Sequence, residues 1–467
     1  MPIQEGRGHP YIPNAVPAVK AEMLAAIGAR SIAELYGDIP ESLRYRGTMK
    51  IPEAIDSELL LRRHVEGILA ANTSCDEATS FLGGGCYNHY VPVICDEIGR
   101  RSEFITAYTG RAYEDFGRYQ VIWEYQSLMA ELLDMDICNV PTYDGFQASC
   151  TSLRMAGRYT GRKQVVVPCN ISPDRLKAIR NYCEPVLAVE TLKADPRSGR
   201  MDLTHLQAVL GPATAAVYFE NPAYLGFLES QGARIAEMAH DAGALVVVGA
   251  DPSSLGVLTP PSGYGADLVC GDIQALGNHM SLGGGMGGFI ASRDEEKLVM
   301  EYPSRLYGIT GTVEAGERAF GEVAFERTSL ARREHGKEFV GTGAASHAIA
   351  ACVYLALMGP GGMRDLGLHL LQKAQYLAQR LSALPGVRAP GLKGPFFKEF
   401  VVDFNATGLA VAEINQALLR ERIFGGKDLS ADFPRLGQSA LYCVTELVSQ
   451  EEIDRFIKVL AGILGGK

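Results

Sequence analysis

The sequence predicts an α/β fold in which helices cover both faces of a parallel sheet. Three short apolar runs, rich in valine and bounded by turn residues, occupy 164–168, 213–219 and 245–250. Helical patterns alternate with these runs, at 173–181, 203–210 and 232–242. Strands that are apolar almost throughout, separated by helices, are typical of a parallel sheet that is buried on both faces.

The regions before and after these strands have different sequence patterns. Before the sheet, 19–35, 57–71 and 119–133 carry apolar residues at helical spacing, and Pro40 and Pro52 interrupt this region. After about Gly311 we expect helices at 343–358, 362–384 and 451–464 and strands at 399–404 and 440–444. The predicted organisation is therefore a helical N-terminal arm (1–100), a large α/β domain (101–310) and a small α+β C-terminal domain (311–467). Aspartate-aminotransferase-like proteins have this order of parts, but pattern alone leaves other doubly wound folds open.

Composition excludes several classes of function. The 467 residues include 44 Lys plus Arg and 54 Asp plus Glu, a net charge of 44 − 54 = −10 that disfavours binding to nucleic acid or to an anionic membrane. No run approaches the roughly 20 apolar residues of a membrane span, and the N-terminus lacks a signal-peptide pattern, so we expect a cytoplasmic protein. The ten cysteines are scattered without a C-x-x-C pair, which predicts buried thiols and no metal site.

Asp251 is the first candidate functional residue. It directly follows the apolar run 245–250, and ligands of open parallel sheets bind at the carboxyl ends of the strands. A carboxylate there could hold the pyridinium nitrogen of pyridoxal phosphate (PLP) protonated. Asp251 also precedes Pro252, so a plain turn or helix-cap role is the alternative.

Two glycine-containing segments are weaker signals. The stretch 143–149 leads into a predicted helix after Gly145, and a helix N-terminus can bind a phosphate or another anion. The segment 283–288 is all glycine except Met286, but strand-like Phe289-Ile290 follows it. A dinucleotide fingerprint requires a helix at that point, so this segment is a functional loop or a plain connection.

The distribution of lysine is more informative. The chain has 13 lysines, yet none lies between Lys193 and Lys297. A PLP enzyme of this fold carries its Schiff-base lysine just before such a glycine-rich segment, because the amine must reach the aldehyde from the strand end. The gap therefore falls where that lysine would be needed, although chance is an alternative in a lysine-poor chain.

These features together resemble a known family. The sequence is similar to subunit 1, the α chain, of the two-subunit glycine dehydrogenase (decarboxylating), the P component of the glycine cleavage system. The similarity runs from Pro10 to about Leu384. Its main stretches are 10–14, 22–28, 80–92, 101–109, 125–126, 135–136, 143–145, 250–256, 264–267, 274–277, Ser281 and 283–284.

The resemblance implies an aspartate-aminotransferase-like fold and a role. In that family the α chain has lost the lysine, and a homologous β chain carries the lysine and PLP within an α2β2 assembly. The complex decarboxylates glycine and transfers the aminomethyl group to a lipoyl carrier protein. By this resemblance the present chain is inactive alone. Asp251 is then a relic of the pyridinium site, and His89, Tyr90, Tyr108 and Thr109 are candidates to contact substrate or partner.

Two segments depart from the family pattern, at 110–119 and 332–338. They leave open a divergent paralogue that serves another amino acid. A catalytically silent scaffold or regulatory subunit is a further alternative, and a stand-alone PLP enzyme without a local lysine is a third.

Overall fold

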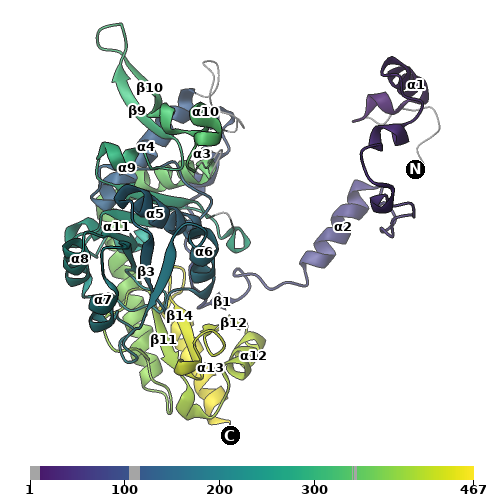
Figure 1. Cartoon of the computed structure of the whole chain (residues 1–467). Helices are drawn as coiled ribbons and strands as arrows, with labels where there is room; N and C mark the ends of the chain where they lie inside the picture. The colour runs from purple at the N-terminus through teal and green to yellow at the C-terminus, as the bar shows by residue number, and fades with distance from the viewer. Residues whose placement is uncertain (1–10, 105–115, 285, 339, 341–343, 467) are drawn as a thin grey trace. The chain divides into compact units, whose positions relative to one another are not determined.

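The structure is a computed structural model that describes residues 11–104, 116–284, 286–338, 340 and 344–466. The chain divides into two compact units, Met1–Ser74 and Cys75–Lys467 (Figure 1). The predicted domain limits at 100 and 310 stay predictions.

The first unit has helices α1 (Pro17–Ala26) and α2 (Glu58–Leu69) joined by short 3-10 turns. Helix α1 is shorter than the predicted 19–35, because Gly28 adopts a left-handed backbone (φ 71°) that ends the helix. The Ser57 hydroxyl caps α2 by accepting a hydrogen bond from the Leu60 N–H at 3.4 Å. No described residue between 11 and 74 is buried, so this unit has no core of its own.

The second unit is built on a seven-stranded sheet of order β2-β8-β7-β6-β5-β3-β4. The strands are β2 (Ile137–Cys138), β3 (Gln164–Pro168), β4 (Ala188–Leu192), β5 (Thr214–Glu220), β6 (Leu245–Gly249), β7 (Leu268–Asp272) and β8 (Gly288–Ser292). The five strands from β4 to β7 pair in parallel, and β8 pairs with β7 and β2 in antiparallel fashion. The predicted fold class is confirmed, with an antiparallel edge added.

Both faces of the sheet are buried, which explains the continuous apolar strands. Val166, Val217 and Val246 face one core, and Val165 and Val247 face the other. Helices cover the sheet in Figure 1. Those of this region are α3 (Val93–Gly99), α4 (Phe116–Leu133), α5 (Gly145–Thr160), α6 (Pro173–Cys183), α7 (Leu203–Val209), α8 (Gly232–Asp241) and α9 (Glu296–Val299).

The C-terminal part forms its own small sheet and core. Its strands β11 (Glu399–Asp403), β14 (Ser439–Cys443) and β13 (Lys427–Asp428) pair in that order, all antiparallel. Helices α12 (Val411–Arg420) and α13 (Gln450–Gly465) pack on it, and β1 (Thr79–Ser80) pairs in parallel with β12 (Ile423–Phe424). A hairpin of β9 (Leu306–Gly311) and β10 (Arg318–Val323) and a short helix, α10 (Ser329–Arg332), precede this part.

The two helices predicted at 343–358 and 362–384 form one long element, α11 (Ala345–Ser382). A kink at Gly359 (φ 56°) next to Pro360 separates its halves. By length and composition alone α11 could cross a membrane. Its residues Leu370, Ala374 and Leu377 are fully buried against the rest of the protein, so α11 serves as a core helix here.

Candidate functional site

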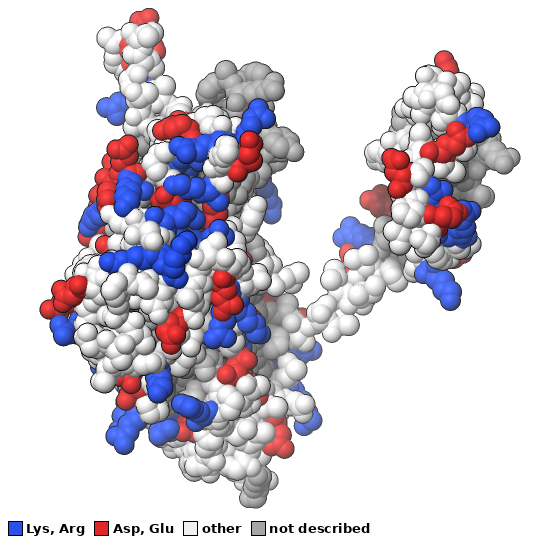
Figure 2. All heavy atoms as spheres, in the orientation of Figure 1, with Lys and Arg blue, Asp and Glu red and all other residues white. Residues whose placement is uncertain are grey.

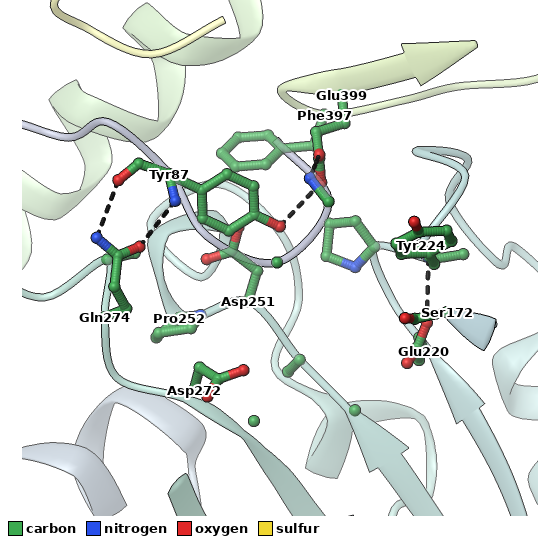
Figure 3. Close-up of a pocket in the computed structure, with 18 of the residues that line it drawn as sticks. Tyr87, Ser172, Glu220, Tyr224, Asp251, Pro252, Asp272, Gln274, Phe397 and Glu399 are labelled. Atoms are coloured by element: carbon green, nitrogen blue, oxygen red, sulfur yellow. Dashed lines mark hydrogen bonds between the residues drawn. The ribbon is translucent and has the colours of Figure 1, made fainter. Parts of the chain in front are cut away.

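The main cavity of the described residues, about 80 Å³, lies at the carboxyl ends of the parallel strands. Glu220, Asp251 and Asp272 line it where β5, β6 and β7 end. The glycine-rich stretch after β1 closes one side with Tyr87 (Figure 3). The segment before β11 closes another side with Lys398. Parallel strands end at one edge of a sheet, so the fold gathers these polar groups at the position where such sheets bind ligands.

Asp251 has a buried partner. The Lys398 ammonium lies 2.7 Å from Asp251 Oδ2, and the Lys398 side chain is 2% exposed. Asp251 also caps the turn after β6, because its carboxylate accepts hydrogen bonds from the Ser253 N–H and hydroxyl. Burial by itself would raise the pKa of Asp251, but the Lys398 ammonium and the Ser253 donors outweigh it and hold that pKa below its ordinary value. Asp251 is therefore a carboxylate at neutral pH.

Lys398 is held by aromatic and imidazole groups as well. Its Nζ lies 3.5 Å from the centre of the Tyr87 ring, a cation–π arrangement, and 3.1 Å from the Ser253 hydroxyl. It is also 2.9 Å from His89 Nε2, and His89 Nδ1 is 2.7 Å from a Glu446 carboxylate oxygen. Burial and the Lys398 charge lower the pKa of His89, so the ring is neutral. In the tautomer that satisfies both contacts, Nδ1–H donates to Glu446 and Nε2 accepts from Lys398.

Glu399, the first residue of β11, holds the glycine-rich stretch. It accepts hydrogen bonds from the Gly84 N–H at 2.7 Å and from the Tyr87 hydroxyl at 2.9 Å. Burial raises the pKa of Glu399 to about 7, because these donors only partly replace lost hydration. The Gln274 side chain fixes Tyr87 from below, since it bonds both the N–H and the carbonyl of that residue (Figure 3).

The N-terminus of α5 also has a partner from within the chain. Asp272 Oδ1 accepts a hydrogen bond from the Gly145 N–H at 2.6 Å. A Cβ at Gly145 would lie 2.5 Å from Asp272 Oδ2, so only glycine permits this approach. Burial raises the pKa of Asp272 to about 6. Arg175 lies 3.8 Å from Asp272 and 3.2 Å from Glu220, which neutralises part of the charge at this end of the cavity.

The residues predicted from sequence fall into three groups. Asp251 and His89 lie together, joined through Lys398. Tyr90 is 55% exposed, and its backbone N–H donates to Glu446 at 2.7 Å. Tyr108 and Thr109 lie outside the described residues. The roles of these residues toward substrate or partner stay predictions.

Three central residues were missed by sequence reasoning, namely Arg175, Lys398 and Glu399. Lys398 and Glu399 are a charged pair inside the apolar run Phe396-Phe397-Lys398-Glu399-Phe400, and both are buried. Two adjacent charges in an otherwise apolar run were the available signal. Seven of the ten cysteines are buried, and all ten are free thiols, as the sequence predicts.

Comparison with protein families and curated sequences gives one consistent result. The model of the family described as glycine cleavage system P-protein matches residues 9–460. A relative from Carboxydothermus hydrogenoformans, named probable glycine dehydrogenase (decarboxylating) subunit 1, is 38% identical over 97% of this chain and 99% of its own. A relative of the same name from Staphylothermus marinus is 36% identical over 98% of both chains.

Comparison with solved structures points to the same family as the sequence comparison. A crystal structure of glycine decarboxylase (P-protein) of the glycine cleavage system, in inhibitor-bound form, superposes with a TM-score of 0.84 at 33% identity, covering 96% of this chain and 98% of that one. The sphingosine-1-phosphate lyase of Burkholderia pseudomallei matches with a TM-score of 0.64 at 14% identity, over 92% and 94% of the two chains. The second likeness concerns the fold alone.

Proposed function

We propose that this chain, which belongs to the glycine cleavage system P-protein family, is the subunit of a decarboxylating glycine dehydrogenase that carries no PLP of its own. The single observation behind this proposal is the ion pair of 2.7 Å between Lys398 and Asp251. A carboxylate that is already neutralised by an internal ammonium is not available to a pyridinium nitrogen.

The residues present do not fit the cofactor that the fold implies. No lysine occurs between Lys193 and Lys297, so the last strands of the sheet offer no amine for a Schiff base. Lys398 does not replace it, because the aldehyde of PLP lies opposite the ring nitrogen, whereas Lys398 is held at the carboxylate that would meet that nitrogen. At the other end, Asp272 places a carboxylate on the α5 N-terminus, where it would repel a phosphate. This mismatch supports a partner that holds the cofactor.

The partner that we propose is the second subunit of the enzyme, a homologous chain with the lysine. Subunit 1 in the names of the relatives implies a subunit 2. Of the 35 exposed large apolar side chains among the described residues, 20 lie between Tyr11 and Leu69. Figure 2 shows uncharged surface between the charged groups of this unit. Stable interfaces bury roughly 1,600 Å², and twenty half-exposed apolar side chains offer an area of that order.

We propose that the assembled enzyme decarboxylates glycine and transfers the aminomethyl group to a lipoyl carrier. When bound to the partner, PLP supplies the electron sink for release of CO2. This chain contributes the segment from Gly84 to Tyr90, which closes the partner's active site and excludes water from it. His89, Tyr90, Tyr108 and Thr109 stay the candidates for that contact.

The first experiment locates the cofactor. The chain and its proposed partner are purified separately and together with PLP, treated with borohydride, and each chain is analysed by peptide mass. We expect the reduced adduct on a lysine of the partner alone. An adduct on this chain, at Lys398 or elsewhere, would contradict the proposal.

The second experiment tests the reaction. Exchange of labelled CO2 into the carboxyl group of glycine is measured for each chain and for the pair. We expect exchange only for the pair, with alanine and serine as control substrates. A pair that associates but exchanges only another amino acid would make this chain part of a paralogous enzyme, and a pair that never associates would favour a separate scaffold role.

A further inference from the structure

We infer that Lys398 and Asp272 act as internal counter-charges in the place of a bound cofactor, and that they keep the segment from Gly84 to Tyr90 ordered for the partner. This inference rests on the proposed function, in which the chain binds no PLP, and adds which residues replace the charges of the absent cofactor. A site that evolved around a dipolar ligand keeps polar walls, and those walls need charges of opposite sign when the ligand is gone.

The cationic corner lies at the end of β6. The Asp251 side chain is only 14% exposed, and a carboxylate that has lost most of its hydration is costly without a partner. Lys398 satisfies it at 2.7 Å and lies at the same time over the face of the Tyr87 ring at 3.5 Å. A protonated ring nitrogen would be satisfied by this same carboxylate. The Lys398 ammonium thus places at the Asp251 carboxylate the positive charge that a pyridinium would bring.

The anionic corner lies at the start of α5. This helix is 16 residues long, and its first N–H groups carry the positive end of the helix dipole. The Asp272 carboxylate accepts from the Gly145 N–H at 2.6 Å, and Arg175 lies 3.8 Å away from its second oxygen. A phosphate is the usual anion at such a position. Asp272 thus places at the start of α5 the negative charge that the phosphate of a bound cofactor would bring.

The cationic corner continues into the glycine-rich stretch. Lys398 contacts His89, and His89 contacts Glu446, which accepts the Tyr90 N–H as well. The neighbouring Glu399 holds Gly84 and Tyr87. The segment from Gly84 to Tyr90 is therefore held at its start by Glu399 and at its end by Lys398 and Glu446. The exposed Tyr90 side chain at its end depends on this network for its place.

Chemical rescue separates this inference from an ordinary buried ion pair. Lys398→Ala removes three carbons and the ammonium, and propylammonium has the same atoms as this missing group. Asp272→Ala removes the carboxylate, and formate corresponds to that missing group. We expect Lys398→Ala to lower the melting temperature of the isolated chain by about 5 °C. Propylammonium should restore at least about half of that loss, and the uncharged n-propanol should not. Formate, but not formamide, should likewise raise the melting temperature of Asp272→Ala.

The double variant tests the link to the cofactor. PLP should raise the melting temperature of Lys398→Ala/Asp272→Ala by several degrees more than that of the unaltered chain, because the ligand brings both missing charges. Lys427→Ala is the matched control. Its ammonium bonds the hydroxyl of Tyr224, a residue that lines the cavity, at 2.6 Å, and the Lys427 side chain is 37% exposed. This variant should therefore respond to neither amine nor PLP.

Absence of rescue by the ions and by PLP would overturn the inference, and so would an equal response of the Lys427→Ala control. If Lys398→Ala does not fold, Lys398→Met/Asp251→Asn removes both charges together. Recovered folding then supports charge compensation, and continued failure contradicts it. All of these measurements use the isolated chain without glycine or partner, so the inference and the proposed function can fail independently.

Discussion

The N-terminal unit and the cavity of the second unit differ in which side chains they expose to solvent and which they bury. Between 11 and 74 no described residue is buried, and α2 presents Leu61, Val65 and Ile68 to solvent on one face. In the cavity even charged groups are enclosed, as Lys398 at 1% and Glu399 at 8% exposure show. One region leaves apolar surface uncovered, and the other covers polar groups with partners from its own chain.

This difference teaches where the chain depends on another molecule. A cavity whose charges are paired internally needs no ligand for its stability. A helix such as α2, which has an apolar face, gains most of its stability from packing that face, and no residue described in its own unit is buried to provide a core. We therefore expect changes in the cavity to act on the folding of the isolated chain, and changes in the N-terminal unit to act on association.

The largest effect should follow Asp251→Ala. This substitution leaves the Lys398 ammonium buried beside a neutral His89, at a cost of about 3–5 kcal/mol in the free energy of unfolding. Urea unfolding of the isolated chain measures it. The matched substitution in the N-terminal unit, Asp38→Ala, concerns an exposed carboxylate and should stay within about 0.5 kcal/mol. Equal effects at the two sites would remove the contrast between the regions.

The second effect concerns association. Leu61→Asp, Val65→Asp and Ile68→Asp, made together, place charges on the apolar face of α2. We expect the dissociation constant with the partner to rise at least about 100-fold, since each residue would bury one apolar side chain. The unfolding curve of the second unit should not change. Arg62→Ala and Glu66→Ala, which remove exposed charged side chains of the same helix, serve as controls, and analytical ultracentrifugation gives the affinities.

The third effect is a pH dependence of stability from Glu399. Its folded pKa of about 7 exceeds the ordinary value of 4.5, so the folded state binds this proton more tightly. The stabilising contribution is complete below pH 4.5 and is lost as the pH rises to 7, a change of up to about 3 kcal/mol. Glu399→Gln should flatten this part of the curve, leaving the smaller contribution of Asp272, whose pKa is raised in the same direction. An unchanged slope would show that Glu399 is hydrated in solution.

The smallest effect compares two helix caps. Ser449 caps α13, whose residues Ile453 and Phe456 are fully buried, whereas Ser57 caps the uncovered α2. Ser449→Ala should reduce global stability by about 1 kcal/mol. Ser57→Ala should change only the local hydrogen exchange of α2 in the free chain. A global loss from Ser57→Ala would mean that α2 is part of the folded core.

Much of the fold could be predicted, because its signals are local. The strand at 164–168 matches β3 at both ends, since its valines face two separate cores and the pattern has no polar break. The helix predicted at 19–35 is shorter, because Gly28 ends it and no core lies nearby to extend it. The kinked α11 was expected as two helices, because Gly359 and Pro360 mark a break that tertiary packing bridges.

The candidate site was predicted only in part. Asp251 could be placed by its position after a strand, a local rule of parallel sheets. Lys398 could not, because it lies just before β11, 147 positions later in the chain, and meets Asp251 only when the small sheet packs on the large one. The same holds for Glu399 and the glycine-rich stretch, whose contacts span more than 300 positions.

The missing lysine was visible in the sequence, since an absence from 194 to 296 needs only the order of residues to be noticed. The family and the fold class followed from sequence as well, because both are carried by local patterns and motifs. The tertiary structure alone decided what fills the place of the absent group. Charges separated along the chain pair only through packing, and it is packing that brings Lys398 to Asp251 and Asp272 to the first turn of α5.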